Sequence, residues 1–289
     1  MSKPTLKRSL LLLLNRLVLV VACLLTLFPA LWVVAASFSQ GVSLYSGGLI
    51  PAKLTWDNYR QLFFRDGHLG GTDFLLWMKN SLIICLPASF LGVGLTTTMA
   101  YAFSRFRFAG RRFGLLVLVL LQMFPAIMSI IALFRLLQVL GLLDKLLGLI
   151  IVYGCGSIGF NTWLLKGYLE SIPRDLEEAA YIDGATYWQA FTRVVLPLAT
   201  PMLVVVFFFN FIGFFQEYLL ASVILFRPEL RPIALGMRFY ITGKYSQNWT
   251  GFSAASIVAS LPILIIFFAL QKLFEFGHVR LTKAIVIGI

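Results

Sequence analysis

The longest stretch of this chain without a charged residue lies between Arg16 and Lys53. Within it, the apolar run 17–37 is about 20 residues long, and a helix that rises about 1.5 Å per residue crosses a hydrocarbon core of about 30 Å with that length. The apolar region of a cleavable signal peptide is shorter, at about 7–15 residues. We therefore predict an uncleaved first membrane span.

Further apolar runs follow along the chain, and the composition agrees with them. Hydrophobic residues make up 60% and charged residues 12% of the 289 residues, whereas about a quarter of the residues of a soluble domain are charged. The sequence predicts an all-α fold, a polytopic membrane helical bundle with six transmembrane helices. The predicted spans are 17–37, 81–103, 113–140, 146–165, 198–222 and 252–270, within a transmembrane domain of residues 17–273 that has an N-terminus of residues 1–16 and a C-terminal tail of residues 274–289.

The short connection 104–112 sets the predicted orientation. It carries four arginines and no acidic residue, and short loops of this kind stay in the cytoplasm. Six spans then place both termini and the segment 170–197 in the cytoplasm. The net charge of +12 comes from basic residues spread over membrane-flanking loops, so we expect membrane lipid and no nucleic acid as a partner. The four arginines are Arg105, Arg107, Arg111 and Arg112.

The segment 170–197 is polar, and it holds five of the twelve acidic residues. Gly184 can end a first short helix in the left-handed conformation without a Cβ penalty. Thr186 followed by Gln189 is a capping-box pattern that starts a second helix, and Pro197 is predicted to close it. On these signals alone, the segment is an amphipathic loop that lies on the membrane surface. The five acidic residues are Glu170, Asp175, Glu177, Glu178 and Asp183.

Three polar residues in the spans are candidates for lining a transport pathway, namely Gln122, Asn210 and Glu217. Pro125 is predicted to kink the third span, and Gln122 needs a partner within the bundle, either as a packing residue or as a pore-lining one. An acid at a helix centre costs roughly 2.5–3.5 kcal/mol on insertion, so Glu217 is expected to face a cavity or the headgroups. The run 154–159 matches G-x-G-x-x-G but lies in an apolar span, where we interpret it as close helix packing and not as a dinucleotide site.

No energy source for transport is visible in the sequence. It has no G-x-x-x-x-G-K-[ST] segment that would cradle phosphates, and Glu217 is the only ionisable candidate deep in a span. His68 and His278 lie far apart, and no cysteines have C-x-x-C spacing, so a catalytic or metal site has almost nothing to be built from. We expect no cofactor in this chain and a partner that supplies the energy. The cysteines, predicted to be small buried residues, are Cys23, Cys85 and Cys155.

The spacing of residues within 170–197 carries a family resemblance. Glu178-Ala179-Ala180 is followed after three residues by Gly184, and after nine more by Val194-x-Leu196-Pro197. The segment resembles the EAA loop of ABC importer permeases, whose pattern is Glu-Ala-Ala, x3, Gly, x9, Ile, x, Leu-Pro, with only the Ile changed. In that family the loop is a coupling element that docks on a cytoplasmic ATPase. The docking residues inferred from the match and its acidic neighbours are Glu177, Glu178, Ala179, Ala180, Asp183, Gly184, Ala185, Leu196 and Pro197.

Other motifs extend the resemblance to roughly residues 25–273. They are Pro29-Ala-Leu-Trp, Asn80-Ser-Leu, Tyr101-Ala-Phe-Ser-Arg, Gln122-Met-Phe-Pro and Leu165-Lys-Gly-Tyr. Together with the EAA segment they are similar to the second permease subunit of maltose/maltodextrin-type ABC importers, which have the type I importer fold. The resemblance implies a heterodimer with a sister permease, two copies of an ABC ATPase that bind ATP and Mg²⁺, and an extracellular or periplasmic sugar-binding protein. It also implies the bacterial cytoplasmic (inner) membrane.

The function we predict is that of a permease subunit, not an enzyme. With its sister permease it forms an alternating-access pathway for a maltose/maltodextrin-type oligosaccharide. One alternative is a self-sufficient secondary carrier or channel for a small polar solute, which would transport without an ATPase. Another is an integral-membrane enzyme, which would need a polar catalytic cluster that the sequence lacks.

Overall fold

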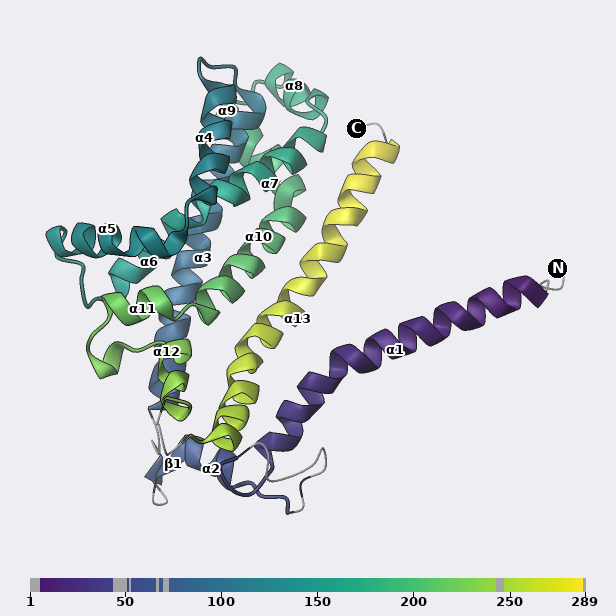
Figure 1. The fold of residues 1–289 in the computed structure, drawn as a ribbon. Helices are drawn as coiled ribbons and strands as arrows, with labels where there is room; N and C mark the ends of the chain where they lie inside the picture. The colour runs from purple at the N-terminus through teal and green to yellow at the C-terminus, as the bar shows by residue number, and fades with distance from the viewer. Residues whose placement is uncertain are drawn as a thin grey trace. The chain divides into compact units, whose positions relative to one another are not determined.

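A computed structural model of the chain describes residues 6–43, 51, 53–65, 68–69, 73–242 and 247–287. These residues are mainly helical, with one hairpin of two short strands (Figure 1). The chain divides into one unit of residues 1–74 and 237–260 and a second of residues 75–236 and 261–289. The elements, in chain order, are α1 (Leu6–Ser37), α2 (Asp57–Phe63), β1 (Phe64–Arg65), β2 (His68–Leu69), α3 (Phe74–Arg105), α4 (Arg111–Met123), α5 (Ala126–Val139), α6 (Leu146–Gly156), α7 (Ile158–Ser171), α8 (Asp175–Ile182), α9 (Tyr187–Ala190), the π-helical turn η1 (Phe191–Val195), α10 (Leu196–Gln216), α11 (Leu219–Ile224), η2 (Pro228–Leu230), α12 (Ile233–Met237), η3 (Arg238–Tyr240) and α13 (Trp249–Ile287).

The first unit is built around the end of α1. That helix ends at Ser37, as the first predicted span does, but it begins at Leu6, well before residue 17. The buried amide of Asn58 in α2 donates hydrogen bonds to the backbone oxygens of Ser37 and Ser39 at 2.9 and 3.0 Å. These bonds fix α2 to the chain that leaves the first span.

Two apolar clusters hold the second unit together, and α3 contributes to both. Near one end of α3, Ile84 packs with Leu137 and Leu149 in a buried cluster. Near its other end, Tyr101 packs with Leu165 and other buried residues of α7 and of the segment that follows. Because α3 joins the two clusters, a displacement at either end of this unit has a direct path to the other.

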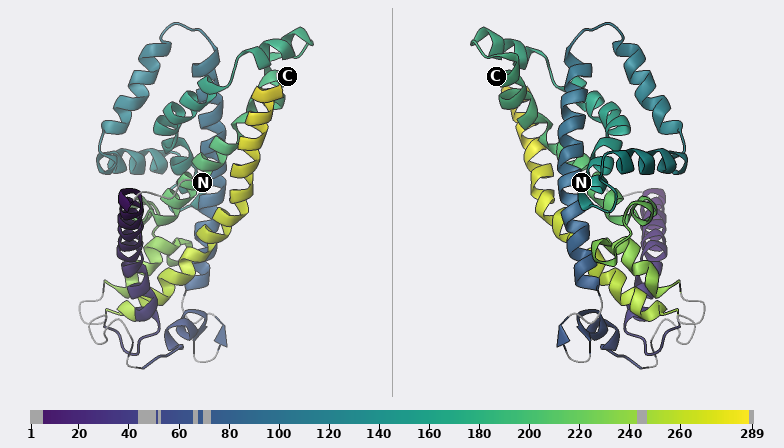
Figure 2. Two further views of the ribbon diagram at one scale, coloured as in Figure 1. Left: turned by 90° about the vertical axis from the view of Figure 1, so that its right-hand side faces the viewer. Right: turned by 90° about the vertical axis from the view of Figure 1, so that its left-hand side faces the viewer.

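Two of the predicted spans are pairs of helices with a break between them. The helices α4 and α5 meet at 103°, and α6 and α7 meet at 43°. Pro125 lies at the first break, where it precedes α5 and has no N–H to continue the helix. Figure 2 shows α4 folding back from the end of α3 before the chain turns sharply into α5. The predicted kink at Pro125 is therefore confirmed.

The helical bundle predicted from the sequence is confirmed. Among the described residues, four helices are long and apolar enough to cross a membrane, and each bent pair, counted as one span, brings the number to six. Several boundaries differ from the prediction besides the start of α1, and α3 begins at Phe74 and not at residue 81. The helix α10 ends at Gln216, not near residue 222, and α13 continues as a helix through the residues predicted to form a tail, as far as Ile287.

A loop–loop contact joins the connection after α5 to the one after α11. Asp144 has a left-handed φ of 56°, and its carboxylate accepts hydrogen bonds from the backbone N–H groups of Phe226 and Arg227 at 2.9 and 3.1 Å. The Arg227 Nε lies 2.7 Å from the same carboxylate. Desolvation raises the pKa of Asp144, but these hydrogen bonds outweigh it and hold the pKa below its usual range.

Candidate functional site

The helices α8 and α9 form the centre of the segment 170–197, and both of their caps follow the prediction. At the end of α8, Gly184 has a φ of 84°. Its N–H donates to the oxygen of Tyr181, and the N–H of Ala185 donates to the oxygen of Ala180, which is a complete Schellman motif. At the start of α9, Thr186 and the residue three positions later form the predicted capping box.

The prediction that Pro197 closes the second helix is wrong. The helix α9 continues through η1 into α10, and Pro197 lies in the first turn of α10. Proline lacks the N–H that an α-helix needs at an interior position, and its ring clashes with the carbonyl four residues earlier. The π-helical turn before it accommodates the missing bond by widening the helix locally. As a result, Tyr187–Gln216 is one continuous helical segment of 30 residues.

A buried ion pair attaches α8 to the end of α3. The Oε1 of Glu177 lies 2.5 Å from the Nε of Arg105, and both side chains are almost fully buried. The Oε2 of Glu177 accepts a hydrogen bond from the hydroxyl of Tyr101 at 2.9 Å. We expected Glu177 to face a partner, but its carboxylate is turned into the protein, where a cation 72 positions earlier in the sequence neutralises it.

Two further hydrogen bonds strengthen the same attachment. The Nη2 of Arg105 donates to the backbone oxygen of Ile172 at 3.1 Å. In the reverse direction, the Nη2 of Arg174 donates to the backbone oxygen of Ser104 at 3.0 Å. The segment before α8 is therefore tied to α3 by side chains from both sides.

The outer side of α8 and α9 remains exposed. Of the predicted docking residues, Glu178, Ala179, Asp183 and Gly184 are exposed, and Ala180, Ala185, Leu196 and Pro197 are partly buried. The prediction missed three large apolar side chains that are 87%, 66% and 66% exposed. Their presence in an otherwise polar segment is the sequence signal that could have identified them as docking residues. These three residues are Ile182, Tyr187 and Trp188.

A cavity of about 970 Å³ lies within the second unit and brings the other three predicted residues together. Gln122 comes from α4, Asn210 from α10, and Glu217 from the residue that follows α10. Asn161 of α7 donates a hydrogen bond to the Oδ1 of Asn210 at 2.8 Å. The hydroxyl of Tyr153 in α6 donates a short hydrogen bond to Glu217. Four helices thus supply polar groups to one otherwise apolar cavity.

Glu217 also explains why the fifth span ends earlier than predicted. Its carboxylate accepts hydrogen bonds from the backbone N–H groups of Leu220 and Ala221 at 2.7 and 3.2 Å. These are N–H groups of the first turn of α11, which have no partner inside that helix. A carboxylate that caps a new helix stabilises the change of chain direction at this point.

The run 154–159 was predicted to serve close helix packing, and two of its three glycines do so. A Cβ at Gly154 would lie 2.7 Å from the Cδ2 of Leu91 in α3, and a Cβ at Gly159 would collide with the side chain of Gln122. A Cβ at Gly156 would meet nothing within 4 Å. Glycine at the first two positions therefore permits α3 and α4 to approach the α6–α7 pair closely.

The cysteines depart from their predicted burial. Cys85 is buried, but Cys23 and Cys155 are exposed because they lie on helix faces that this chain leaves uncovered. Within the described ranges, no three His, Cys, Asp or Glu residues gather at a distance that would hold a metal ion.

Comparison with known proteins places these features in a family. The model described as binding-protein-dependent transport system inner membrane component matches residues 91–278. The chain is 39% identical to the galactooligosaccharides transport system permease protein GanQ of Bacillus subtilis, over 94% of this chain and 95% of that protein. It is 40% identical to the maltose/maltodextrin transport system permease protein MalG of Escherichia coli K12, over 85% of this chain and 86% of that protein.

A solved structure confirms the fold. It is a bacterial ABC transporter involved in the import of the acidic polysaccharide alginate, with a TM-score of 0.75 and 24% identity over 94% of this chain and 99% of that chain. The membrane-length helices, the cavity and the capped helical loop of this chain agree with the permease relatives above. The chain belongs to the family of binding-protein-dependent transport system inner membrane components, with the type I ABC importer permease fold. It is thus a multi-pass transport subunit of the cytoplasmic membrane.

Proposed function

We propose that this chain is the permease subunit of an ATP-driven oligosaccharide importer and that α8 and α9 dock on the ATPase. The exposed side of these helices combines apolar side chains, such as Ile182 and Trp188, with the carboxylates of Glu178 and Asp183. Short helices of this composition fit an apolar groove whose rim is basic. The carboxylates fix the register of docking, and the apolar side chains supply the buried area.

The observation that carries the proposal is the continuity between the loop and the cavity. The helical segment Tyr187–Gln216 begins in the loop and brings Asn210 to the cavity wall. The ion pair between Glu177 and Arg105 provides a second connection, through α3. A movement imposed on α8 and α9 by ATPase closure would therefore reach the cavity through two helices, as rigid-body switching requires.

The assembly we propose has four kinds of subunit. This chain pairs with a sister permease as a heterodimer, two copies of a cytoplasmic ABC ATPase bind ATP and Mg²⁺, and a solute-binding protein delivers the sugar. The arginine-rich connection 104–112 supports a cytoplasmic position for the loop and for both termini.

The substrate we propose is a neutral oligosaccharide of the maltose/maltodextrin type. Both permease relatives above are named for oligosaccharides. Among the described residues that line the cavity, Glu217 is the one ionisable carboxylate, and no lysine or arginine lines it. An acidic sugar would meet this charge without a compensating cation from this chain. The exposed rings of Phe160 and Phe209 offer stacking surfaces to a sugar that lacks charge.

The test is uptake by the complete complex in proteoliposomes. We expect ATP-dependent uptake of maltotriose and no uptake of a trimer of uronic acid. Uptake of the uronic trimer at an equal rate would overturn the proposed substrate class but not the ATPase coupling. Uptake of either sugar by this chain alone, without an ATPase, would instead support the self-sufficient carrier.

Variants at Gly184 test the docking of the loop. Gly184→Pro cannot adopt a φ of 84°, so we expect ATP hydrolysis to continue without transport while the spans remain folded. Gly184→Asn is the matched control, because asparagine tolerates the left-handed conformation, and it should retain most of the uptake. Full transport by the proline variant would contradict the docking proposal.

A further inference from the structure

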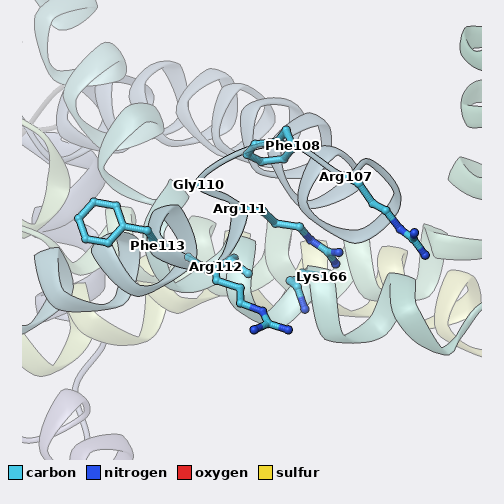
Figure 3. A pocket seen from close by; sticks show the side chains of 8 residues that line it. Arg107, Phe108, Gly110, Arg111, Arg112, Phe113 and Lys166 are labelled. Atoms are coloured by element: carbon cyan, nitrogen blue, oxygen red, sulfur yellow. The ribbon is translucent and has the colours of Figure 1, made fainter.

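A pocket of about 670 Å³ lies between the start of α4 and α7, and it belongs neither to the docking helices nor to the cavity lined by Gln122, Asn210 and Glu217. We call it the basic pocket because four of its eight lining residues are cations. Figure 3 shows the charged ends of Arg111, Arg112 and Lys166 gathered on one side of it, with the ring of Phe113 pointing away from them. The four cationic residues are Arg107, Arg111, Arg112 and Lys166.

The positive charge of the basic pocket is only partly balanced. Within the part of the chain that the structure describes, Glu170 is the one carboxylate paired with these cations, at 3.2 Å from Arg111 and 2.7 Å from Lys166. The side chains of Arg107 and Arg112 form no hydrogen bond or ion pair with any described residue. One carboxylate therefore faces four cations, which leaves a site that favours an anion.

The helix α4 adds to this preference at its first turn. It is 13 residues long and begins after Gly110, which has a φ of 85° and offers no side-chain cap. The first N–H groups of such a helix have no partner within the helix, and its dipole favours negative charge. An anion in the basic pocket would lie beside this uncapped end as well as beside the free guanidinium groups.

An apolar strip leads away from the basic pocket along the same helix. Phe113, Leu116 and Leu120 follow the i, i+3, i+7 spacing of one helical face, and their side chains are 70%, 55% and 53% exposed. A ligand that fits both surfaces has an anionic head and a hydrocarbon tail. A free phosphate ion would use only the first surface, and an acidic protein segment would leave the strip uncovered.

We propose that the basic pocket binds the headgroup phosphate of an anionic phospholipid, with one acyl chain along Phe113, Leu116 and Leu120. The free guanidinium groups of Arg107 and Arg112 hold the phosphate, while Arg111 and Lys166 remain shared with Glu170. Basic residues near a membrane surface attract anionic lipids by about 1 kcal/mol each. This inference does not depend on the transported solute.

The experiment is native mass spectrometry of the full chain, extracted together with the subunits that accompany it. The probes are dioleoyl phosphatidylglycerol and, as the neutral comparison, dioleoyl phosphatidylcholine. We expect preferential retention of phosphatidylglycerol, and about 30-fold weaker retention by R107Q/R112Q, since two cations are removed. R16Q/K272Q removes the same charge from exposed helical positions elsewhere and should retain the lipid.

Several results would overturn the proposal. Equal loss in R16Q/K272Q would show a general charge effect, and equal retention of both lipids would show that the headgroup charge is irrelevant. Displacement of the lipid by soluble glycerol phosphate would indicate a free-phosphate site. A photo-crosslinker at position 112 that reacts with a partner protein and never with lipid would assign the pocket to a subunit interface. R107K/R112K should restore retention, which separates loss of binding from loss of folding.

Discussion

Removal of the buried carboxylate at Glu177 should detach the docking helices from α3. In Glu177→Gln, the hydrogen bond from Tyr101 has an acceptor, but the guanidinium of Arg105 loses its counter-charge at a position where its side chain is only 7% exposed. Breaking a buried ion pair by removing one partner costs about 3–5 kcal/mol. Arg105 keeps its hydrogen bond to the oxygen of Ile172, so we expect the lower value.

The loss of stability should be confined to the docking helices, because the apolar clusters that hold the bundle do not include Glu177. Hydrogen–deuterium exchange over residues 175–190 measures it directly, since exchange there reports local opening. A loss of about 3 kcal/mol corresponds to exchange that is about 150-fold faster. The exchange rate of the amides in α3 should change little.

Two controls make the experiment decisive. Glu178→Gln removes an exposed carboxylate at the next position, and surface substitutions of this kind change stability by less than about 0.5 kcal/mol. Replacing Arg105 and Glu177 together by methionine should recover much of the protection, because no unpaired charge is left buried. If Glu177→Gln and Glu178→Gln exchange at the same rate, the ion pair does not hold the loop.

Two other predictions concern the packing and the loop–loop contact. Gly154→Val should lower the melting temperature in detergent, because a Cβ there would lie 2.7 Å from Leu91 and overpacking costs about 1–3 kcal/mol. Gly156→Ala is the control and should leave the melting temperature unchanged, because a Cβ at Gly156 meets open space. Equal melting temperatures for the two variants would refute the close approach of Gly154 to Leu91. The lowered pKa of Asp144 means that its contact with Arg227 stabilises the fold above the ordinary carboxyl pKa of about 3.9 and is lost as the pH falls through the lower folded value. The difference in melting temperature between wild type and Asp144→Asn should therefore be constant from about pH 5 to pH 7 and shrink below about pH 4, and a difference that grows on acidification would contradict this account.

The sequence predicted those features whose signals are local. The helix caps at Gly184 and Thr186 depend on residues a few positions apart, and the break at Pro125 depends on one missing N–H group. Polar residues are rare in spans and costly to leave in lipid, which is why Gln122 and Glu217 were candidates for lining a pathway; that they share one cavity is a finding of the structure.

The features that the sequence did not predict depend on residues far apart in the chain. The inward orientation of Glu177 depends on Arg105, which no spacing rule connects to it. The end of α10 depends on the side chain of Glu217, which caps α11. Hydrophobic residues continue on both sides of this break, so the hydropathy of the sequence does not mark it. Pro197 was expected to end a helix because a π-helical turn, which lets the helix continue, has no recognised sequence pattern.

Co-purification tests the central claim most directly. With a tag on this chain and mass identification of what accompanies it after detergent extraction, we expect a second permease and an ABC ATPase. The variant that combines Glu178→Lys with Gly184→Pro should lose the ATPase and keep the sister permease. If the chain is recovered alone and still moves solute in vesicles, the segment 170–197 is only a surface loop and the chain is a self-sufficient carrier.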